Sequence, residues 1–125
     1  MTDINQEFRH RVYIGTERAH YPGNMMAGAG ILGLVTDAST EWGILKNGKS
    51  SLLAAVKEAS FLQPVYSGET LEIILRPGRI GNRSRETNFE VYKYYSKEGG
   101  TAKAVVFDQP LLVSKGILVG VIPKE

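Results

Sequence analysis

The sequence predicts an α+β fold in which one antiparallel sheet wraps around a single long helix. Only one stretch, residues 26–45, has the apolar spacing that is typical of a long helix. The stretches before and after it alternate between apolar and polar residues, as half-buried strands do. Turns that contain glycine or proline separate these stretches, and no second helical pattern is present to cover the sheet.

The length and composition indicate one ordinary globular domain over residues 1–125. The chain has 125 residues, of which 42% are hydrophobic and 22% are charged. It has no cysteine, which excludes disulfides, a thiol nucleophile and cysteine-ligated zinc or iron. The two histidines, His10 and His20, cannot form a metal cluster by themselves. We therefore expect no bound metal.

Charge and hydropathy restrict the partners of this chain. The formal net charge of +2 is too small to indicate a nucleic-acid binder. The longest uncharged apolar run, residues 25–35, is only about half of the roughly 20 residues that a membrane-spanning helix needs. The polar N-terminus does not have the apolar stretch of a signal peptide. We expect a cytoplasmic protein that binds neither nucleic acid nor membrane.

The elements follow in a simple order. The first strand is expected over residues 8–14, where Phe8, His10 and Val12 share one face, and a loop follows at 16–25. The helix then presents one apolar stripe, made of Ile31, Val35, Ala38, Trp42 and Leu45. Further strands are expected over residues 51–61, 70–76, 86–95, 101–113 and 116–122.

The first turns of the helix are rich in small residues, namely Ala27, Gly28, Ala29, Gly30 and Gly33. Each internal glycine costs a helix roughly 1 kcal/mol relative to alanine. We expect the close approach of another backbone to compensate for this loss of helix stability. We also expect the helix to be buried on most of its circumference. The glycine spacing formally matches a dinucleotide-binding fingerprint, but a loop precedes it where that motif requires a strand, so close packing explains it better.

Two acidic residues in the middle of the helix carry the sharpest chemical signal. Asp37 and Glu41 lie one turn apart and project on the same side, away from the apolar stripe. On an exposed face they would be ordinary solvated carboxylates. In a buried and glycine-rich setting they would be suited to general acid–base catalysis. We predict that both residues line a mostly dry pocket.

Polar groups also gather where the helix begins. His20, Tyr21 and Asn24 precede it, and they are as well suited to stabilising a loop as to orienting a ligand. The first-turn amides, near Ala27 and Gly28, lack partners within the helix and lie at its positive end. Such amides form a candidate site for an oxyanion or a polarised carbonyl oxygen.

Arginines are concentrated in a short segment that starts at the last residue of the predicted 70–76 strand, at Arg76, Arg79, Arg83 and Arg85. Clustered arginines at turns suit phosphate groups because the guanidinium fork matches phosphate geometry. The alternative is a solvated strand end that resists aggregation. We favour the phosphate interpretation in combination with the fold.

The order of elements resembles that of the hotdog-fold family of acyl-CoA enzymes, over about residues 8–113. The segment at 61–73 begins Phe-Leu-Gln-Pro-Val-Tyr-Ser-Gly-Glu, which is similar to the family's Phe-x-x-Pro-Val-x-x-Gly-Asp/Glu connection between its second and third strands. This resemblance implies an antiparallel sheet wrapped around a central helix, with an active site at a subunit interface and the helix pointing at the substrate thioester. It identifies the fold more specifically than the activity.

A narrower resemblance comes from His-Tyr-Pro-Gly-Asn-Met-Met-Ala-Gly-Ala at 20–29 and Thr-Asp-Ala-Ser-Thr-Glu-Trp at 36–42. Together these segments are similar to the 3-aminobutyryl-CoA ammonia lyases of lysine fermentation and their β-alanyl-CoA relatives. The resemblance implies a lyase without metal or cofactor that removes ammonia from a β-aminoacyl-CoA to give an enoyl-CoA such as crotonyl-CoA. The Asp-x-Asn-Pro-x-His motif of R-specific hydratases is missing, which argues against that activity.

The reaction assigns a role to each candidate group. Asp37 and Glu41 would serve as the base and the ammonium-binding group, in an order that the sequence leaves open. Tyr21 and Asn24 would position the thioester, and the arginines would meet the phosphates of coenzyme A. The alternatives are an acyl-CoA thioesterase in which a helix carboxylate activates water, and a non-catalytic acyl-CoA-binding protein.

The predicted fold also has consequences for assembly. One helix on one curved sheet leaves a strand edge and an apolar face uncovered, so we expect at least a homodimer. Hexamers are common in the family that this chain resembles, but the sequence does not fix the number of subunits.

Overall fold

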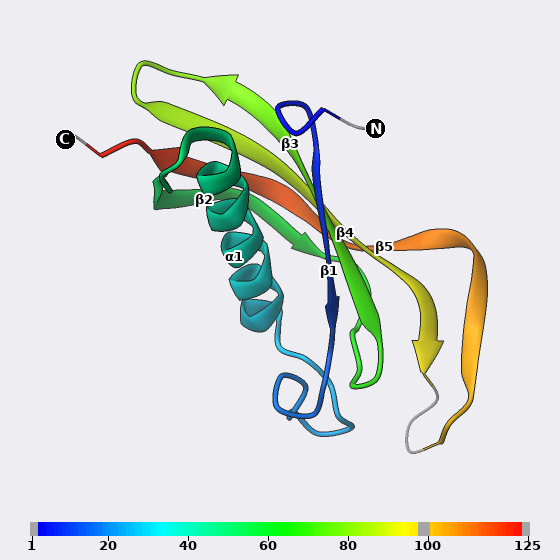
Figure 1. The fold of residues 1–125 in the computed structure, drawn as a ribbon. Helices are drawn as coiled ribbons and strands as arrows, with labels where there is room; N and C mark the ends of the chain where they lie inside the picture. The colour runs from blue at the N-terminus through cyan, green and yellow to red at the C-terminus, as the bar shows by residue number, and fades with distance from the viewer. Residues whose placement is uncertain (1–2, 98–100, 124–125) are drawn as a thin grey trace.

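The computed structural model describes residues 3–97 and 101–123, and its elements follow the predicted order (Figure 1). They are β1 (Phe8–Tyr13), α1 (Gly28–Asn47), β2 (Leu52–Phe61), β3 (Thr70–Ile80), β4 (Ser84–Lys97) and β5 (Ala104–Val121). The strands form one antiparallel sheet in the order β1-β3-β4-β5-β2, and α1 lies on one face of it. The predicted α+β arrangement is confirmed. In the described ranges, no helix has both the length and the apolar character needed to cross a membrane.

The helix begins and ends two residues later than predicted. At its start, the Met26 N–H donates to the carbonyl oxygen of Val65 at 2.8 Å, which keeps this residue outside the helix. At its end, Gly48 adopts a left-handed φ of 74° and its N–H donates to the Ile44 oxygen at 2.7 Å. This is the C-terminal arrangement that glycine favours, because glycine has no side chain to oppose a positive φ.

The apolar stripe of α1 faces the sheet for most of its length. Four of the five predicted residues are buried, namely Ile31, Val35, Ala38 and Trp42. The fifth prediction is wrong, because Leu45 is 55% exposed where no described segment packs over it. Leu34 also lies on this side of the helix, near its start, and it is buried although it was not among the five predicted residues.

The expectation of burial around most of the helix is also wrong for the single chain. At Gly28 an added Cβ would lie 3.4 Å from the ring of Phe61, which is an ordinary contact with a side chain, so the predicted close approach of another backbone is not found there. At Gly33 a Cβ would meet no atom of the described chain within 4 Å. One flank of α1 therefore remains open, and both Asp37 and Glu41 are exposed on it.

Strand β4 is two residues longer at each end than predicted, and strands β3 and β5 continue through predicted breaks that the structure forms as irregular pairings. Strand β3 does not stop before Pro77 but continues to Ile80, with a register shift between these two residues. Strand β5 joins two predicted strands into one, and next to the predicted break its pairing with β4 shifts between Val91 and Tyr92, opposite Ser114 and Leu112. Proline cannot donate to a strand ladder, and an irregular site in a strand accommodates it.

The junction of β5 with β2 and β4 leaves no room for a side chain at Gly116. An added Cβ would lie 2.6 Å from the ring of Phe89 and closer still to the carbonyl oxygen of Glu58. We expect Gly116→Ala to lower the free energy of unfolding by about 1–3 kcal/mol or more, because a packed strand junction cannot absorb the methyl group. Urea unfolding followed by circular dichroism measures this. The control is Gly33→Ala, which has open space and better helix propensity; equal midpoints for the two variants would contradict the prediction.

Candidate active site

The carboxylate pair lies on the open flank of α1 that faces β1. The Nδ1 atom of His10 lies 3.4 Å from Oε1 of Glu41, and the Glu41 side chain is 50% exposed. Asp37 precedes Glu41 by one helical turn and is also exposed. The predicted dry pocket is therefore not formed by one chain alone, because no described segment covers this flank. The two acids do share one helix face, as predicted.

His10 is a neighbour of the pair that the sequence interpretation did not include. It lies on β1, opposite Ile73 of β3, and its ring is stacked with that of Phe8 at a centroid distance of 6.5 Å. The alternation of β1 already placed His10 on the same face as Phe8 and Val12. That signal predicted an inward direction for the ring, but the contact with Glu41 depends on the packing of the helix against the sheet.

The segment before α1 is a tight turn held by its backbone. Tyr21 and Met25 form an isolated antiparallel bridge, with hydrogen bonds of 3.0 and 3.3 Å. Between them, Gly23 and Asn24 have φ values of 79° and 58°. The carbonyl oxygen of Asn24 accepts a hydrogen bond from the Ser67 N–H at 3.0 Å. Asn24 thus has a clear conformational reason for its identity, since asparagine tolerates the left-handed region.

The predicted site residues before the helix do not all converge. A hollow of about 270 Å³ includes Asn24 beside Tyr13 and Tyr66. His20 and Tyr21 do not line it; both are exposed, and their rings make an edge-to-face contact at 5.8 Å. The structure of one chain therefore brings Asn24 to a concave surface and leaves the other two on the outside.

The first turn of α1 retains the amides that the sequence predicted. Ala27 is the N-cap, it has extended backbone geometry, and no side chain caps the helix. Its carbonyl oxygen accepts hydrogen bonds from Gly30 and Ile31, at 3.0 and 3.3 Å. The amide of Gly28 precedes these bonds in the first turn, where the ring of Phe61 lies close by. These amides can polarise a carbonyl oxygen that approaches the start of the helix.

The segment at 61–69 positions the start of the helix through a buried ion pair. Glu69 is fully buried, and its carboxylate accepts hydrogen bonds from the Lys93 amine at 3.0 and 3.1 Å. The carboxylate also accepts hydrogen bonds from the backbone N–H of Tyr66 at 2.9 Å, the backbone N–H of Lys97 at 3.0 Å and the Ser96 hydroxyl at 2.9 Å. The Lys93 amine donates to the Pro64 oxygen as well, at 2.9 Å. The same segment forms backbone hydrogen bonds with Met26 and Asn24, so this network fixes the geometry at the start of α1.

The four arginines do not form one cluster. Arg76 lies on the exposed part of β3, where it pairs with Glu7 at 2.9 Å and with Glu90 at 2.7 Å. The hydrogen bond with Glu90 is the main cause that raises the pKa of Arg76. Arg83 donates to the carbonyl oxygen of Ile122 at 2.9 Å, near the end of the chain.

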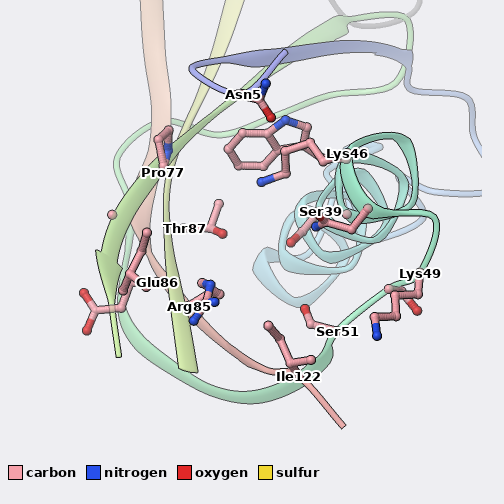
Figure 2. Close-up of a pocket in the computed structure, with 16 residues that line it drawn as sticks. Asn5, Ser39, Lys46, Lys49, Ser51, Pro77, Arg85, Glu86, Thr87 and Ile122 are labelled. Carbon is pink, nitrogen blue, oxygen red and sulfur yellow. The ribbon is translucent and has the colours of Figure 1, made fainter. Parts of the chain in front are cut away.

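The remaining two arginines differ in their surroundings. Arg79 is exposed near the end of β3. Arg85 points to the helix side of β4 and lines a cleft beside the last turns of α1 (Figure 2). Strand bulges and alternation spread these residues over different surfaces, which their spacing in the sequence could not reveal.

Residues 3–97 and 101–123 contain no group of three or more histidine and acidic side chains that could hold a metal ion. The candidate site offers the carboxylates of Asp37 and Glu41, the imidazole of His10 and the amides at the start of α1.

A comparison with protein-family models matches residues 23–99 to a family described as the thioesterase superfamily. The chain belongs to the thioesterase superfamily. The matched range runs from the loop before α1 past the end of β4, so it contains Asp37, Glu41 and the 61–69 segment. The hotdog fold that the sequence predicted is confirmed by this match.

Within the superfamily, two ammonia lyases match nearly end to end. The 3-aminobutyryl-CoA ammonia lyase of Acetoanaerobium sticklandii is 28% identical over 117 residues, which are 92% of this chain and 93% of that protein. The solved β-alanyl-CoA:ammonia lyase from Clostridium propionicum has a TM-score of 0.87 at 26% identity, covering 97% of this chain and 92% of that one.

A solved acyl-CoA hydrolase from Staphylococcus aureus, in complex with coenzyme A, is a more distant member of the same fold. Its TM-score is 0.79 at 14% identity, covering 97% of this chain and 66% of that one. This likeness shows the shared fold alone. The sequence similarity thus favours the lyases over the hydrolase among these superfamily members.

Proposed function

We propose that this chain is an ammonia lyase that converts a β-aminoacyl-CoA, such as 3-aminobutyryl-CoA, into the enoyl-CoA and ammonia. The observation that carries this proposal is the end-to-end similarity to two ammonia lyases, at 26–28% identity against 14% for the hydrolase. The proposed setting is the fermentation of amino acids such as lysine. We propose no cofactor other than the coenzyme A that is part of the substrate.

The proposed reaction needs one base and one group that recognises the amine. One carboxylate of the Asp37 and Glu41 pair removes the proton from the carbon next to the thioester. The electron pair of that C–H bond forms the new double bond, the C–N bond breaks, and its electrons leave with neutral ammonia. The proton remains on the carboxylate. The charge that develops on the thioester oxygen would be stabilised by the amides near Ala27 and Gly28 of the second copy proposed below, because within one helix these amides lie about 13 Å or more from Asp37.

The second carboxylate would hold the substrate ammonium before it leaves. Two acids one turn apart favour a cationic acyl group over the neutral tail of an ordinary acyl-CoA. His10 supports the proposal because its Nδ1 atom on β1 lies 3.4 Å from Oε1 of Glu41, close enough to interact with that carboxylate. A thioesterase would need only one carboxylate to activate water, so the second acid favours the lyase.

We propose that a second copy of the chain completes this site. Strand β2 is an edge strand, and several of its apolar side chains are exposed, with Leu52 at 64% and Leu53 at 52%. The open flank of α1 also exposes Ile44, at 48%, and Leu45 at the end of the apolar stripe is 55% exposed. An unpaired strand edge with exposed apolar side chains is suited to pairing with another copy. A second copy that also covers the open flank of α1 would give the carboxylates the dry surroundings that one chain lacks.

The reverse reaction tests the proposed function directly. The protein is incubated with crotonyl-CoA and ammonium, and both enoyl absorbance and free thiol are followed. A lyase consumes the enoyl absorbance in an ammonium-dependent and reversible way and releases no thiol. Thiol release at a comparable rate without any ammonium dependence would replace the lyase with a thioesterase of the same superfamily.

A further inference from the structure

A cavity of about 450 Å³ lies between the last turns of α1 and the β3–β4 end of the sheet (Figure 2). Trp42 and Lys46 reach it from the helix, and Arg85 and Thr87 reach it from β4. Its other walls include the apolar side chains of Pro77, Ile80 and Ile122. The volume falls in the range of small-molecule sites, which is roughly 300–1,000 Å³. The cavity has room for an organic body as well as for an ion.

The charged side chains that face into this cavity are cations. The Lys46 amine lies over the ring of Trp42, 3.5 Å from its centroid. Arg85 is held in place because its Nη1 atom donates to the carbonyl oxygens of Gly81 at 3.0 Å and Ser84 at 2.9 Å. A guanidinium that is already fixed by the backbone loses little freedom when it binds an anion.

The single acidic residue among those that line the cavity is turned away from it. Strand alternation places the Glu86 side chain on the outer face of β4, and its carboxylate points away from the cavity in Figure 2. There it accepts a hydrogen bond from the Lys57 amine at 3.1 Å. Among the described lining residues, no carboxylate therefore stands between Lys46 and Arg85.

Burial lowers the pKa of the Lys46 amine, and repulsion by Arg85 lowers it further. The negative end of the helix dipole and the ring of Trp42 explain why a lysine is favourable in the last turn. They do not explain why a second cation faces it across a cavity. An anion between the two groups would turn this repulsion into attraction.

We propose that this cavity binds the phosphate of an organic phosphate between Lys46 and Arg85. Lys46 follows Glu41 by more than one helical turn, and at about 100° per residue the two side chains leave the helix on different flanks. The cavity is thus separate from the carboxylate pair. Two sources of the same chemistry fit it: the nucleotide end of a coenzyme A substrate, which rests on the proposed function and extends it, or a separate phosphorylated metabolite.

The structure supplies its own reporter for this test, because Trp42 is the one tryptophan in the chain and lines the cavity. Adenosine 3′,5′-bisphosphate and inorganic pyrophosphate serve as probes, with binding followed by tryptophan fluorescence and by calorimetry. We expect a saturable fluorescence change and an affinity that falls with added salt. Lys46→Met should weaken the bisphosphate about tenfold or more, because a charge-assisted hydrogen bond is lost.

Two further variants separate a binding role from a structural one. Lys46→Arg keeps the cation and should retain binding within a few-fold. Lys103→Met removes the same charge from an exposed position outside the cavity and should bind like the unchanged protein. If the unchanged protein binds neither probe, or if Lys46→Met binds as tightly as Lys103→Met, the proposal is overturned. Probe binding to the unchanged protein tests the proposal even if the variants do not fold.

Kinetics distinguish the two sources of the phosphate. If the cavity holds the nucleotide end of the substrate, Lys46→Met raises the KM for crotonyl-CoA in the ammonium reaction and leaves kcat unchanged. If it holds a separate metabolite, the probes still bind and Lys46→Met leaves KM unchanged. Both outcomes support the anion site. If the probes change the fluorescence of Trp42 but the protein has no lyase activity, the proposed function is contradicted and the assignment of the cavity as a phosphate site still holds.

Discussion

Lys93→Met is expected to lower the free energy of unfolding by about 3–5 kcal/mol, because it leaves a buried carboxylate without its counter-charge. Glu69 is fully buried and Lys93 is 2% exposed, so water cannot replace the lost amine. The carbonyl oxygen of Pro64 loses its donor in the same variant. Chemical denaturation measures the change, with the start of α1 expected to loosen along with the 61–69 segment.

The matched control is Lys115→Met, which makes the same substitution at an exposed position on the same sheet. It should change stability by no more than about 0.5 kcal/mol, as is usual for surface sites. Adding Glu69→Gln to Lys93→Met should recover part of the loss, because glutamine removes the unpaired charge and keeps a side-chain oxygen that can accept the backbone amides of Tyr66 and Lys97. A loss in Lys93→Met no greater than that in Lys115→Met would mean that the ion pair contributes little to stability.

The second large effect is expected on catalysis. Glu41→Gln and Asp37→Asn should each slow ammonia elimination from 3-aminobutyryl-CoA and β-alanyl-CoA, and the loss of the base should cost about 10²–10⁴-fold in kcat. Loss of the ammonium-binding acid should appear instead mainly as a raised KM for ammonium in the reverse reaction. The two variants therefore assign the roles that the sequence leaves open.

Asp108→Asn provides the control for these variants, because it removes one carboxylate from an exposed part of β5. It should keep both kinetic constants. If Asp37→Asn and Glu41→Gln also keep nearly full activity, the catalytic groups lie elsewhere, and the assignment of the helix carboxylates is wrong.

Local patterns in the sequence were sufficient for the architecture. The apolar spacing around Val35 and Trp42 predicted the helix and the face that it buries, and alternation predicted the direction of His10 on β1. The ends of the elements were less accurate, because they depend on contacts with distant segments. The helix starts late because Met26 bonds to Val65, and β3 continues past Pro77 because β4 still pairs with it there.

The site was harder to predict for the same reason. Asp37 and Glu41 could be paired from helical spacing alone, but their exposure depends on what covers the open flank of α1. The pairing of Glu69 with Lys93 joins a residue of the connection before β3 to a residue of β4, and each of them looks like an ordinary surface charge in the sequence. The arginines between Arg76 and Arg85 are close in sequence, yet bulges and alternation direct them to different faces.

The uncovered edge at β2 has a practical consequence for handling the protein. In a newly synthesised copy, the unpaired backbone N–H and C=O groups along the β2 edge can form hydrogen bonds with any extended chain nearby. Correct assembly then competes with misassembly from the moment of synthesis, and crowded overexpression favours the wrong outcome. Slow expression at low temperature should yield more usable protein than rapid induction, and a charged residue placed at Leu53 would protect isolated copies at the expense of their proper association.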